Sequence, residues 1–114
     1  KWKFLKGAKN DPRKKSNGEI FYYKEGPVSF PDPLDRPART IITSEGGTTP
    51  SRFKHVVEQR GKLRRLIPIE LERANMFPDN HTKLSADTKR AFFMGNALVV
   101  GIVEKIGITL SKLI

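Results

Sequence analysis

The sequence predicts an α+β fold, in which a small, twisted and mostly antiparallel sheet is followed by helices. Two observations lead to this class. Short aromatic and β-branched runs, which are typical of strands, occur in the first half of the chain. From Pro68 onward, apolar residues recur at helical spacing instead. A chain of 114 residues has the length of one domain or of part of one.

The first half of the chain divides into strand-like runs and breaks. Residues 1–18 are polar and basic and predict a loop, with an apolar start that forms the end of a strand or an anchor. The run 19–24 predicts the first strand. Four prolines then remove N–H donors, so an extended path over a surface is expected. The runs 39–43 and 51–57 predict two more strands, and Gly61 predicts the turn after them.

Three helices are expected in the second half. The first begins at Pro68, whose fixed φ suits a first helical turn, and ends before Pro78. The second covers residues 85–94, with Ser85 as its N-cap and the next glycine as its stop. Asn96 is expected to cap the last helix. Apolar residues recur along that last helix at helical spacing: Val99, Val103, Ile106, Leu110 and Leu113.

Positive charge is concentrated in the first part of the chain, whose formal net charge is +10. Residues 1–65 contain 16 Lys and Arg against 7 Asp and Glu, whereas residues 66–114 contain 6 against 5. This distribution predicts a phosphate-binding surface in the first part and a packing element in the second. A solvated basic face without a nucleic-acid partner is the alternative.

The loop between the second and third predicted strands has residues suited to a nucleic acid. Its paired glycines permit close approach of the backbone to a ligand, and its hydroxyl groups can donate to phosphates or base edges. A flexible hairpin turn would contain the same residues. On one face of the third strand, Arg52 and Lys54 are further candidates for such contacts, and each is equally consistent with an ordinary exposed charge.

Several classes of site are excluded or disfavoured. The chain has no cysteine, which rules out disulfides and thiolate metal sites. Its two histidines, His55 and His81, are not at metal-ligand spacing, so no metal site is predicted. We find no secretory signal and no apolar run that looks long enough to cross a bilayer, so a cytoplasmic protein without membrane contact is expected.

Two ordered motifs resemble those of a known family. The first motif is formed by Arg64, Leu66, Pro68, Glu70, Arg73, Phe77, Pro78 and Asp79. The second motif, residues 94–100, reads Met-Gly-Asn-Ala-Leu-Val-Val and follows the first at the expected distance. Together they resemble the ninth and tenth motifs of the cytosine-5 DNA methyltransferases. The chain departs from the ninth motif at Ile67, Leu71 and Met76, where the family has Thr, often Cys, and Gly.

The resemblance implies three parts in the chain. Residues 1–62 would be the target-recognition region, residues 63–84 the helix of motif nine, and residues 85–114 the helices that dock on the large cofactor-binding domain. It also implies that the glycine-containing loop contacts duplex DNA. With the basic candidates above, the predicted DNA-binding residues are Ser44, Glu45, Gly46, Gly47, Thr48, Thr49, Arg52 and Lys54.

The resemblance assigns the motif residues supporting roles. The ninth motif would hold the recognition region in place and would take no part in catalysis. Its residues are Arg64, Pro68, Glu70, Arg73, Phe77, Pro78 and Asp79. Asn96 and Ala97 would lie beside S-adenosylmethionine, with helix capping by Asn96 alone as the alternative.

The family's chemistry requires a cysteine thiolate that attacks C6 of the target cytosine, and this chain has none. We therefore expect no catalytic residue here and no activity from the chain alone. It would be the C-terminal portion, as a small subunit or fragment, of a bacterial restriction-modification methyltransferase, and its fold would be incomplete without the large domain. Its partners would be double-stranded DNA and that catalytic part. In isolation it would self-associate through the last helix.

Two other classes of protein remain open. A stand-alone basic nucleic-acid-binding module would bury its last helix in its own core and be monomeric, whereas a methyltransferase part would expose this helix or swap it between copies. An interaction protein for acidic surfaces would bind DNA without a steep dependence on salt.

Overall fold

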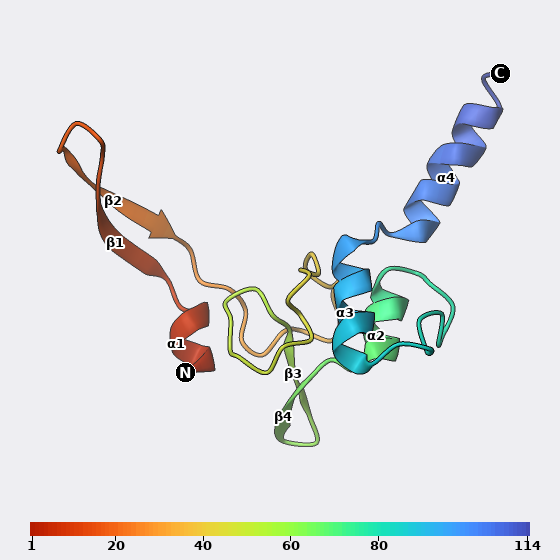
Figure 1. Cartoon of the computed structure of the whole chain (residues 1–114), viewed down its shortest axis with the longest axis horizontal. Helices are drawn as coiled ribbons and strands as arrows, with labels where there is room; N and C mark the ends of the chain where they lie inside the picture. The colour runs from red at the N-terminus through yellow and green to blue at the C-terminus, as the bar shows by residue number, and fades with distance from the viewer.

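The computed structural model describes all residues, 1–114, and confirms the α+β class. The strands pair as two separate antiparallel hairpins, so they do not form one sheet. Figure 1 shows the two hairpins, two packed helices and a last helix that points away from them. In chain order the elements are α1 (Trp2–Lys6), β1 (Lys9–Lys14), β2 (Ile20–Glu25), β3 (Val56–Gln59), β4 (Lys62–Arg65), α2 (Pro68–Ala74), α3 (Asp87–Asn96) and α4 (Val100–Ser111).

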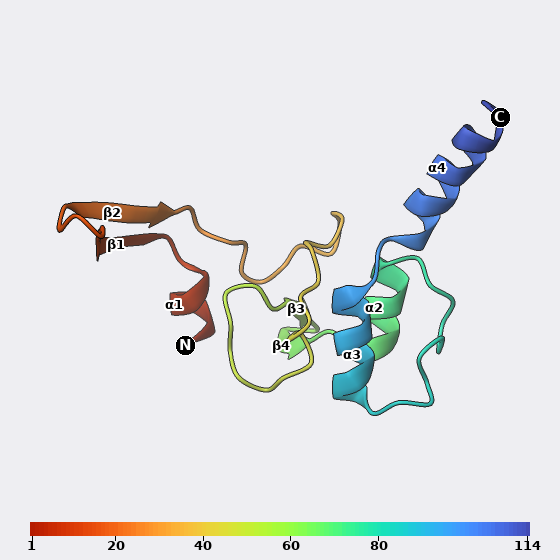
Figure 2. The ribbon, with the colours of Figure 1, turned by 45° about the horizontal axis from the view of Figure 1, so that its top comes forward.

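The first hairpin projects from the body of the molecule (Figures 1 and 2). The predicted strand at 19–24 is confirmed as β2, but the expected loop over residues 1–18 is wrong, because α1 and β1 lie there. Strand β1 has a weak intrinsic strand preference, and it forms by pairing with β2 from Lys9↔Glu25 to Lys14↔Ile20. Pro12 is tolerated because both strands of a two-stranded ribbon are edge strands.

The second hairpin, β3–β4, turns at Arg60 and Gly61, whose φ angles are 53° and 74°. Consecutive positive φ values suit a tight two-residue hairpin turn, as the glycine predicted. The other two predicted strands are corrected. Residues 39–43 are irregular, and only the end of the run 51–57 joins β3. Residues 51–55 form no strand, and the side chains of Arg52 and Lys54 bind backbone carbonyl groups.

A small core lies where α2 and α3 pack on the segment before the glycine-containing loop. The buried apolar side chains are Ile41, Leu71, Ala91 and Met94, and partly buried neighbours extend them. Gly95 allows this packing, because a Cβ atom at that position would lie 2.4 Å from the backbone N of Thr43. The core therefore joins the helices directly to the segment that leads into the loop.

Helix α2 starts at Pro68 as predicted and ends at Ala74, four residues before Pro78. Pro68 is its first residue, and Glu70 accepts the backbone N–H of Ile67 at 2.9 Å, which replaces the side-chain cap that isoleucine cannot supply. At the other end Met76 has φ 61°, and the N–H of Phe77 donates to the carbonyl oxygen of Glu72. Methionine therefore adopts the left-handed geometry that glycine would favour, at a strain cost on the order of 1 kcal/mol.

The caps predicted for the last two helices are wrong. Helix α3 runs past Gly95 to Asn96 and begins at Asp87, so Ser85 lies before it and its N-cap position is Ala86. Asn96 is part of α3 and does not cap α4, whose N-cap position is Val99. Three residues separate the two helices. The N–H of Val100 donates to the carbonyl oxygen of Asn75, which fixes the start of α4 beside the end of α2.

Helix α4 leaves the body after this point and is almost fully exposed (Figure 1). Only Gly101, beneath the side chain of Met76, is buried in α4. Partly for this reason the radius of gyration is 17.9 Å, against roughly 13 Å for a compact chain of this length. The apolar side chains that α4 exposes are Val100, Ile102, Val103, Ile106, Ile108 and Leu110.

The stretch Asp87–Ser111 is long and apolar enough to cross a membrane by length and composition, contrary to the expectation from the sequence. The structure divides this stretch into α3 and α4. The 12 residues of α4 rise roughly 18 Å, less than the roughly 30 Å of a bilayer core.

Candidate nucleic-acid interface

The loop of residues 44–49, which we call the recognition loop, is built around a buried carboxylate. Glu45 is 2% exposed, and its Oε1 accepts the backbone N–H of His55 at 2.9 Å while Oε2 lies 3.2 Å from His55 Nδ1. Burial alone would raise the pKa of Glu45, but the hydrogen bonds from His55 and the charge of Arg65 hold this pKa below its usual value. The carboxylate is thus kept ionised as an anchor for the loop.

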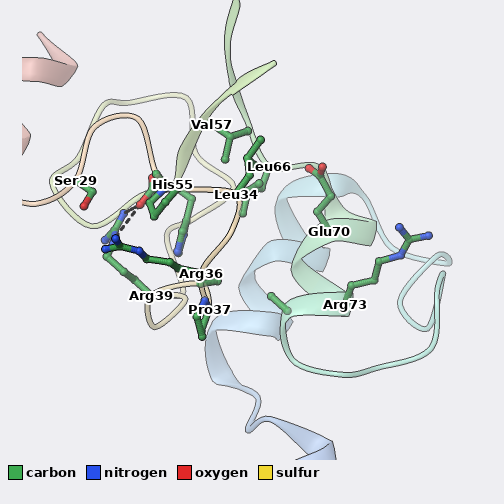
Figure 3. A pocket seen from close by; sticks show the side chains of 14 residues that line it. Ser29, Leu34, Arg36, Pro37, Arg39, His55, Val57, Leu66, Glu70 and Arg73 are labelled. Carbon is green, nitrogen blue, oxygen red and sulfur yellow. Dashed lines mark hydrogen bonds and ion pairs between the residues drawn. The ribbon is translucent and has the colours of Figure 1, made fainter. Parts of the chain in front are cut away.

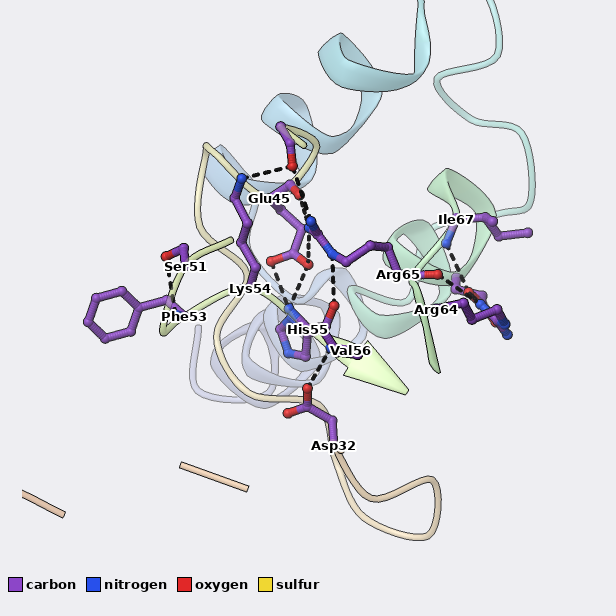
Figure 4. A network of polar contacts seen from close by, with 12 residues as sticks. Asp32, Glu45, Ser51, Phe53, Lys54, His55, Val56, Arg64, Arg65 and Ile67 are labelled. Carbon is purple, nitrogen blue, oxygen red and sulfur yellow. Dashed lines mark hydrogen bonds and ion pairs between the residues drawn. The ribbon is translucent and has the colours of Figure 1, made fainter. Parts of the chain in front are cut away.

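The side chains of Lys54 and Arg65 bind backbone carbonyl groups of the recognition loop (Figure 4). Lys54 Nζ donates to the carbonyl oxygens of Gly47 and Thr49 at 2.8 and 2.7 Å. Arg65 donates to the carbonyl oxygens of Gly47 at 3.1 Å and of Glu45. Burial and the nearby charge of Arg65 lower the pKa of Lys54. Because these groups fix several loop carbonyls, the conformation of the loop is set by the protein itself.

The recognition loop also rests on α3. A Cβ atom on Gly46 would lie 2.9 Å from the Cβ of Ala91 and 3.0 Å from the Cα of Thr88. The first glycine of the pair is therefore needed for contact with the helix. Beyond this contact, the hydroxyl side chains of Ser44, Thr48 and Thr49 are exposed.

The structure separates the eight predicted DNA-binding residues into two groups. Glu45, Arg52 and Lys54 are buried and bind groups of the protein, which gives each of them a structural role. Their burial is possible because their polar atoms are satisfied: carbonyl oxygens accept from Arg52 and Lys54, and Glu45 accepts from the N–H of His55. Of the remaining five residues, Ser44, Gly46, Thr48 and Thr49 are exposed, and Gly47 is partly buried.

Arg52 lies at the base of the first hairpin. Its guanidinium donates to the carbonyl oxygens of Gly7, at 2.6 Å, and of Gly26, and forms an ion pair with Glu25 at 2.9 Å. Gly7 precedes the hairpin and Gly26 follows it. Arg52 therefore joins the two ends of the hairpin to the segment after the recognition loop.

Three supporting residues were missed by the sequence reasoning. Asp32 is buried and accepts the N–H of Val56 at 2.8 Å and Arg39 Nε at 2.9 Å. Lys6 is also buried and pairs with Asp32 at 3.4 Å, which ties α1 to the body. Arg65, which binds the loop carbonyls, was assigned no role from the sequence. The one sequence signal for these residues was the carboxylate of Asp32, which lies between two prolines. If such a carboxylate is buried, it needs a charged or hydrogen-bonding partner.

Two bidentate ion pairs connect α2 with the segments on either side of it. Arg64 binds Glu70 through two contacts of 2.7 and 2.9 Å, which links β4 to the first turn of α2. Arg73 binds Asp79 through contacts of 2.6 and 2.8 Å, which holds the turn after Pro78 against the helix. Such bidentate pairs fix geometry as well as charge.

A cavity of about 490 Å³ lies between the proline-rich segment and α2 (Figure 3). Cationic side chains from both sides line it, together with Asp32 and Glu70. The basic lining residues are Arg36, Arg39 and Arg73. In the absence of any cysteine in the chain, this cavity offers no thiolate nucleophile.

The two residues predicted to contact S-adenosylmethionine differ in their availability. Asn96 is exposed and its amide makes no hydrogen bond within the protein. The N–H of Ala97 already donates to the carbonyl oxygen of Met94 at 3.3 Å, and its side chain packs against the core. Asn96 therefore has a free amide, whereas the backbone N–H of Ala97 is already used within the protein.

These observations describe a loop whose carbonyl groups are held by Lys54 and Arg65, on a small scaffold that the ion pairs of α2 connect to its neighbours. The chain belongs to the C-5 cytosine-specific DNA methylase family, whose sequence model matches residues 1–112. It is 42% identical over 113 residues to the Type II methyltransferase M.Sau3AI of Staphylococcus aureus, a match that covers 99% of this chain and 27% of that protein. The chain thus spans about a quarter of the length of this curated relative. No solved structure matches it significantly.

Proposed function

We propose that this chain is the DNA-recognition and C-terminal portion of a cytosine-5 DNA methyltransferase. In this proposal residues 1–62 grip duplex DNA, residues 63–84 support the recognition loop and residues 85–114 complete the catalytic domain. That domain transfers a methyl group from S-adenosylmethionine to C5 of cytosine. The family membership and the identity with a Type II methyltransferase support this assignment.

The main structural support for this proposal is the way in which the recognition loop is held. The carbonyl groups of the recognition loop are bound by Lys54 and Arg65, while its three hydroxyl side chains remain exposed. A fixed backbone that presents hydroxyl groups can donate hydrogen bonds to base edges in the major groove without first becoming ordered. We assign the DNA contacts of this loop to Ser44, Gly46, Gly47, Thr48 and Thr49.

The rest of the enzyme would come from a separate catalytic part. The nucleophilic cysteine must be supplied there, because this chain contains none, and the chain alone would be inactive. Most of the S-adenosylmethionine site would also lie there, with Asn96 at its edge. The exposed face of α4 supports docking on such a part. The assembled enzyme would act in the bacterial cytoplasm, beside the nucleoid.

The exposure of α4 also bears on the alternative, a stand-alone nucleic-acid-binding module. Such a module would be expected to bury its last helix, and here only Gly101 of that helix is buried. The alternative therefore has less support than the methyltransferase assignment.

Selection from a pool of duplexes with randomised central bases tests the proposal. The chain should enrich a shared sequence among the bound duplexes. The triple variant Ser44→Ala, Thr48→Ala, Thr49→Ala should lose this enrichment, because the groups that donate to base edges are removed.

The double variant Ser29→Ala, Thr40→Ala removes two exposed hydroxyl groups outside the loop and should keep the enrichment. If the unmodified chain binds duplexes without any shared sequence, the recognition function is excluded and the stand-alone basic module is favoured. Equal enrichment by the triple variant would also contradict the assignment.

A further inference from the structure

The projecting hairpin β1–β2 has two chemically different faces. The register places Asp11, Arg13, Phe21, Tyr23 and Glu25 together with Lys9 on one face. This face is internally paired: Arg13 stacks 3.8 Å from the ring centroid of Tyr23, and Tyr23 donates to Glu25. At its base Glu25 pairs with Arg52 of the body. The first face is thus the one that is attached to the protein.

The opposite face carries no acidic residue. All six of its side chains are exposed, and neither of its two lysines forms an ion pair. Tyr22 is 62% exposed, and its hydroxyl makes no hydrogen bond within the protein. We call this set the outer hairpin face: Asn10, Pro12, Lys14, Ile20, Tyr22 and Lys24.

The chemistry of this face matches a polyanion. Two free ammonium groups, one phenol and one amide are donors of the kind that bind phosphate oxygens, and no carboxylate opposes them. Lys14 and Lys24 lie four pair positions apart, which corresponds to about 13 Å along the ribbon. At about 3.4 Å per base pair this is roughly four base pairs of duplex.

We propose that the outer hairpin face is a second DNA contact, which binds the phosphate backbone of duplex DNA beside the site that the recognition loop reads. This inference rests on the proposed function. The hairpin projects well away from the recognition loop (Figures 1 and 2), so both can contact one duplex only at different positions along it. The contact is with phosphates, so it adds affinity and leaves sequence preference unchanged.

The salt dependence of binding to a duplex tests this contact. Fluorescence anisotropy gives the slope of the logarithm of the binding constant against the logarithm of the salt concentration. Lys14→Ala, Lys24→Ala should reduce the magnitude of this slope by about 1.8, because each lost phosphate contact contributes about 0.9. The reduction should appear on a duplex of about 20 base pairs and be absent on one that ends at the recognised site.

The double variant Lys83→Ala, Lys112→Ala is the matched control, since it removes the same charge from two exposed, unpaired lysines outside the hairpin. Its slope should equal that of the unmodified chain. Circular dichroism should show that both double variants fold. An unchanged slope for the hairpin variant would overturn the second contact, and so would an equal reduction in the control.

The duplex selection separates this inference from the proposed function. The hairpin variant should enrich the same sequence as the unmodified chain. If the chain selects a sequence but the hairpin variant shows the full slope, only the hairpin contact fails. If the hairpin variant lowers the slope but no sequence is ever enriched, the recognition function fails and the phosphate contact stands.

Discussion

A single buried carboxylate organises the segment that follows α2. Glu72 is fully buried in α2 and accepts the backbone N–H groups of Asn80 and Thr82 at 2.7 and 3.0 Å. Arg90 from α3 pairs with it at 2.9 Å. Burial alone would raise the pKa of Glu72, but these hydrogen bonds from Thr82, Arg90 and the backbone lower it to about 2.

The lowered pKa of Glu72 makes stability depend on pH. Between its ordinary pKa of 4.5 and about 2, the unfolded chain binds the proton more readily than the folded chain, so stability falls as the pH falls through this range. The contribution is roughly 3 kcal/mol at neutral pH. Glu72→Gln should therefore be less stable than the unmodified chain at pH 7, and this difference should shrink toward pH 3.

Urea unfolding at pH 7, 5 and 3 measures these differences in free energy. Glu104→Gln, on exposed α4, is the control and should match the unmodified chain at every pH. A deficit for Glu72→Gln that stayed constant from pH 7 to pH 3 would show that the carboxylate is not ionised against its partners.

At the scale of elements, local signals predicted some parts and long-range contacts decided the others. The start of helix α2 was predictable because Pro68 and Glu70 mark it within the sequence, whereas Pro78 only limits how far the helix can extend and the helix ends earlier, at Ala74. Strand β1 was not, because its residues become a strand only through pairing with β2. A sequence pattern reports residue preference, and the pairing partner of a weak strand lies outside that pattern.

The loop of residues 44–49 shows the same limit. The position of the loop was predicted from its glycines and hydroxyl residues, and the loop is present with its hydroxyl groups exposed. The inward orientation of Arg52 and Lys54 was not foreseen, because basic side chains are rarely buried without partners. Their partners are backbone carbonyl groups, at Gly7 and Gly47 among others, and the sequence does not indicate where carbonyl groups converge.

The attachment of the first hairpin can be tested through Arg52. Arg52→Ala leaves the carbonyl oxygens of Gly7 and Gly26 and the carboxylate of Glu25 without this donor. The loss of a buried charged donor should destabilise the hairpin by roughly 2–4 kcal/mol. Hydrogen exchange followed by mass spectrometry should then show faster exchange in residues 8–26, with the core helices α2 and α3 unchanged.

Arg60→Ala, at the exposed turn of the second hairpin, removes one arginine without a buried partner and is the control. Its exchange should match the unmodified chain throughout residues 8–26. Slow exchange in that segment for Arg52→Ala would mean that other contacts, such as that between Lys6 and Asp32, are sufficient to hold the hairpin.

For the whole molecule, the decisive feature is how little of its apolar surface is covered. Only six apolar residues are buried, and most of these lie in the core formed by α2 and α3. The exposed apolar side chains of α4 are contiguous along one helix, which is unusual for a chain that stays alone in water. The fixed start of α4, at Val100 and Gly101, holds this surface in a defined direction.

Self-association should therefore depend on α4. Ile106 is 55% exposed and makes no contact with the core, so Ile106→Glu should leave the free energy of unfolding within about 0.5 kcal/mol of the unmodified chain. Sedimentation velocity should show association of the unmodified chain that grows with concentration, and a monomer for Ile106→Glu, because a buried unpaired charge opposes packing of the helix. Lys105→Gln lowers the net charge by the same amount at the adjacent position and should still associate. If the unmodified chain is monomeric, α4 is not an association surface. If Lys105→Gln loses association as fully as Ile106→Glu, the effect comes from net charge alone.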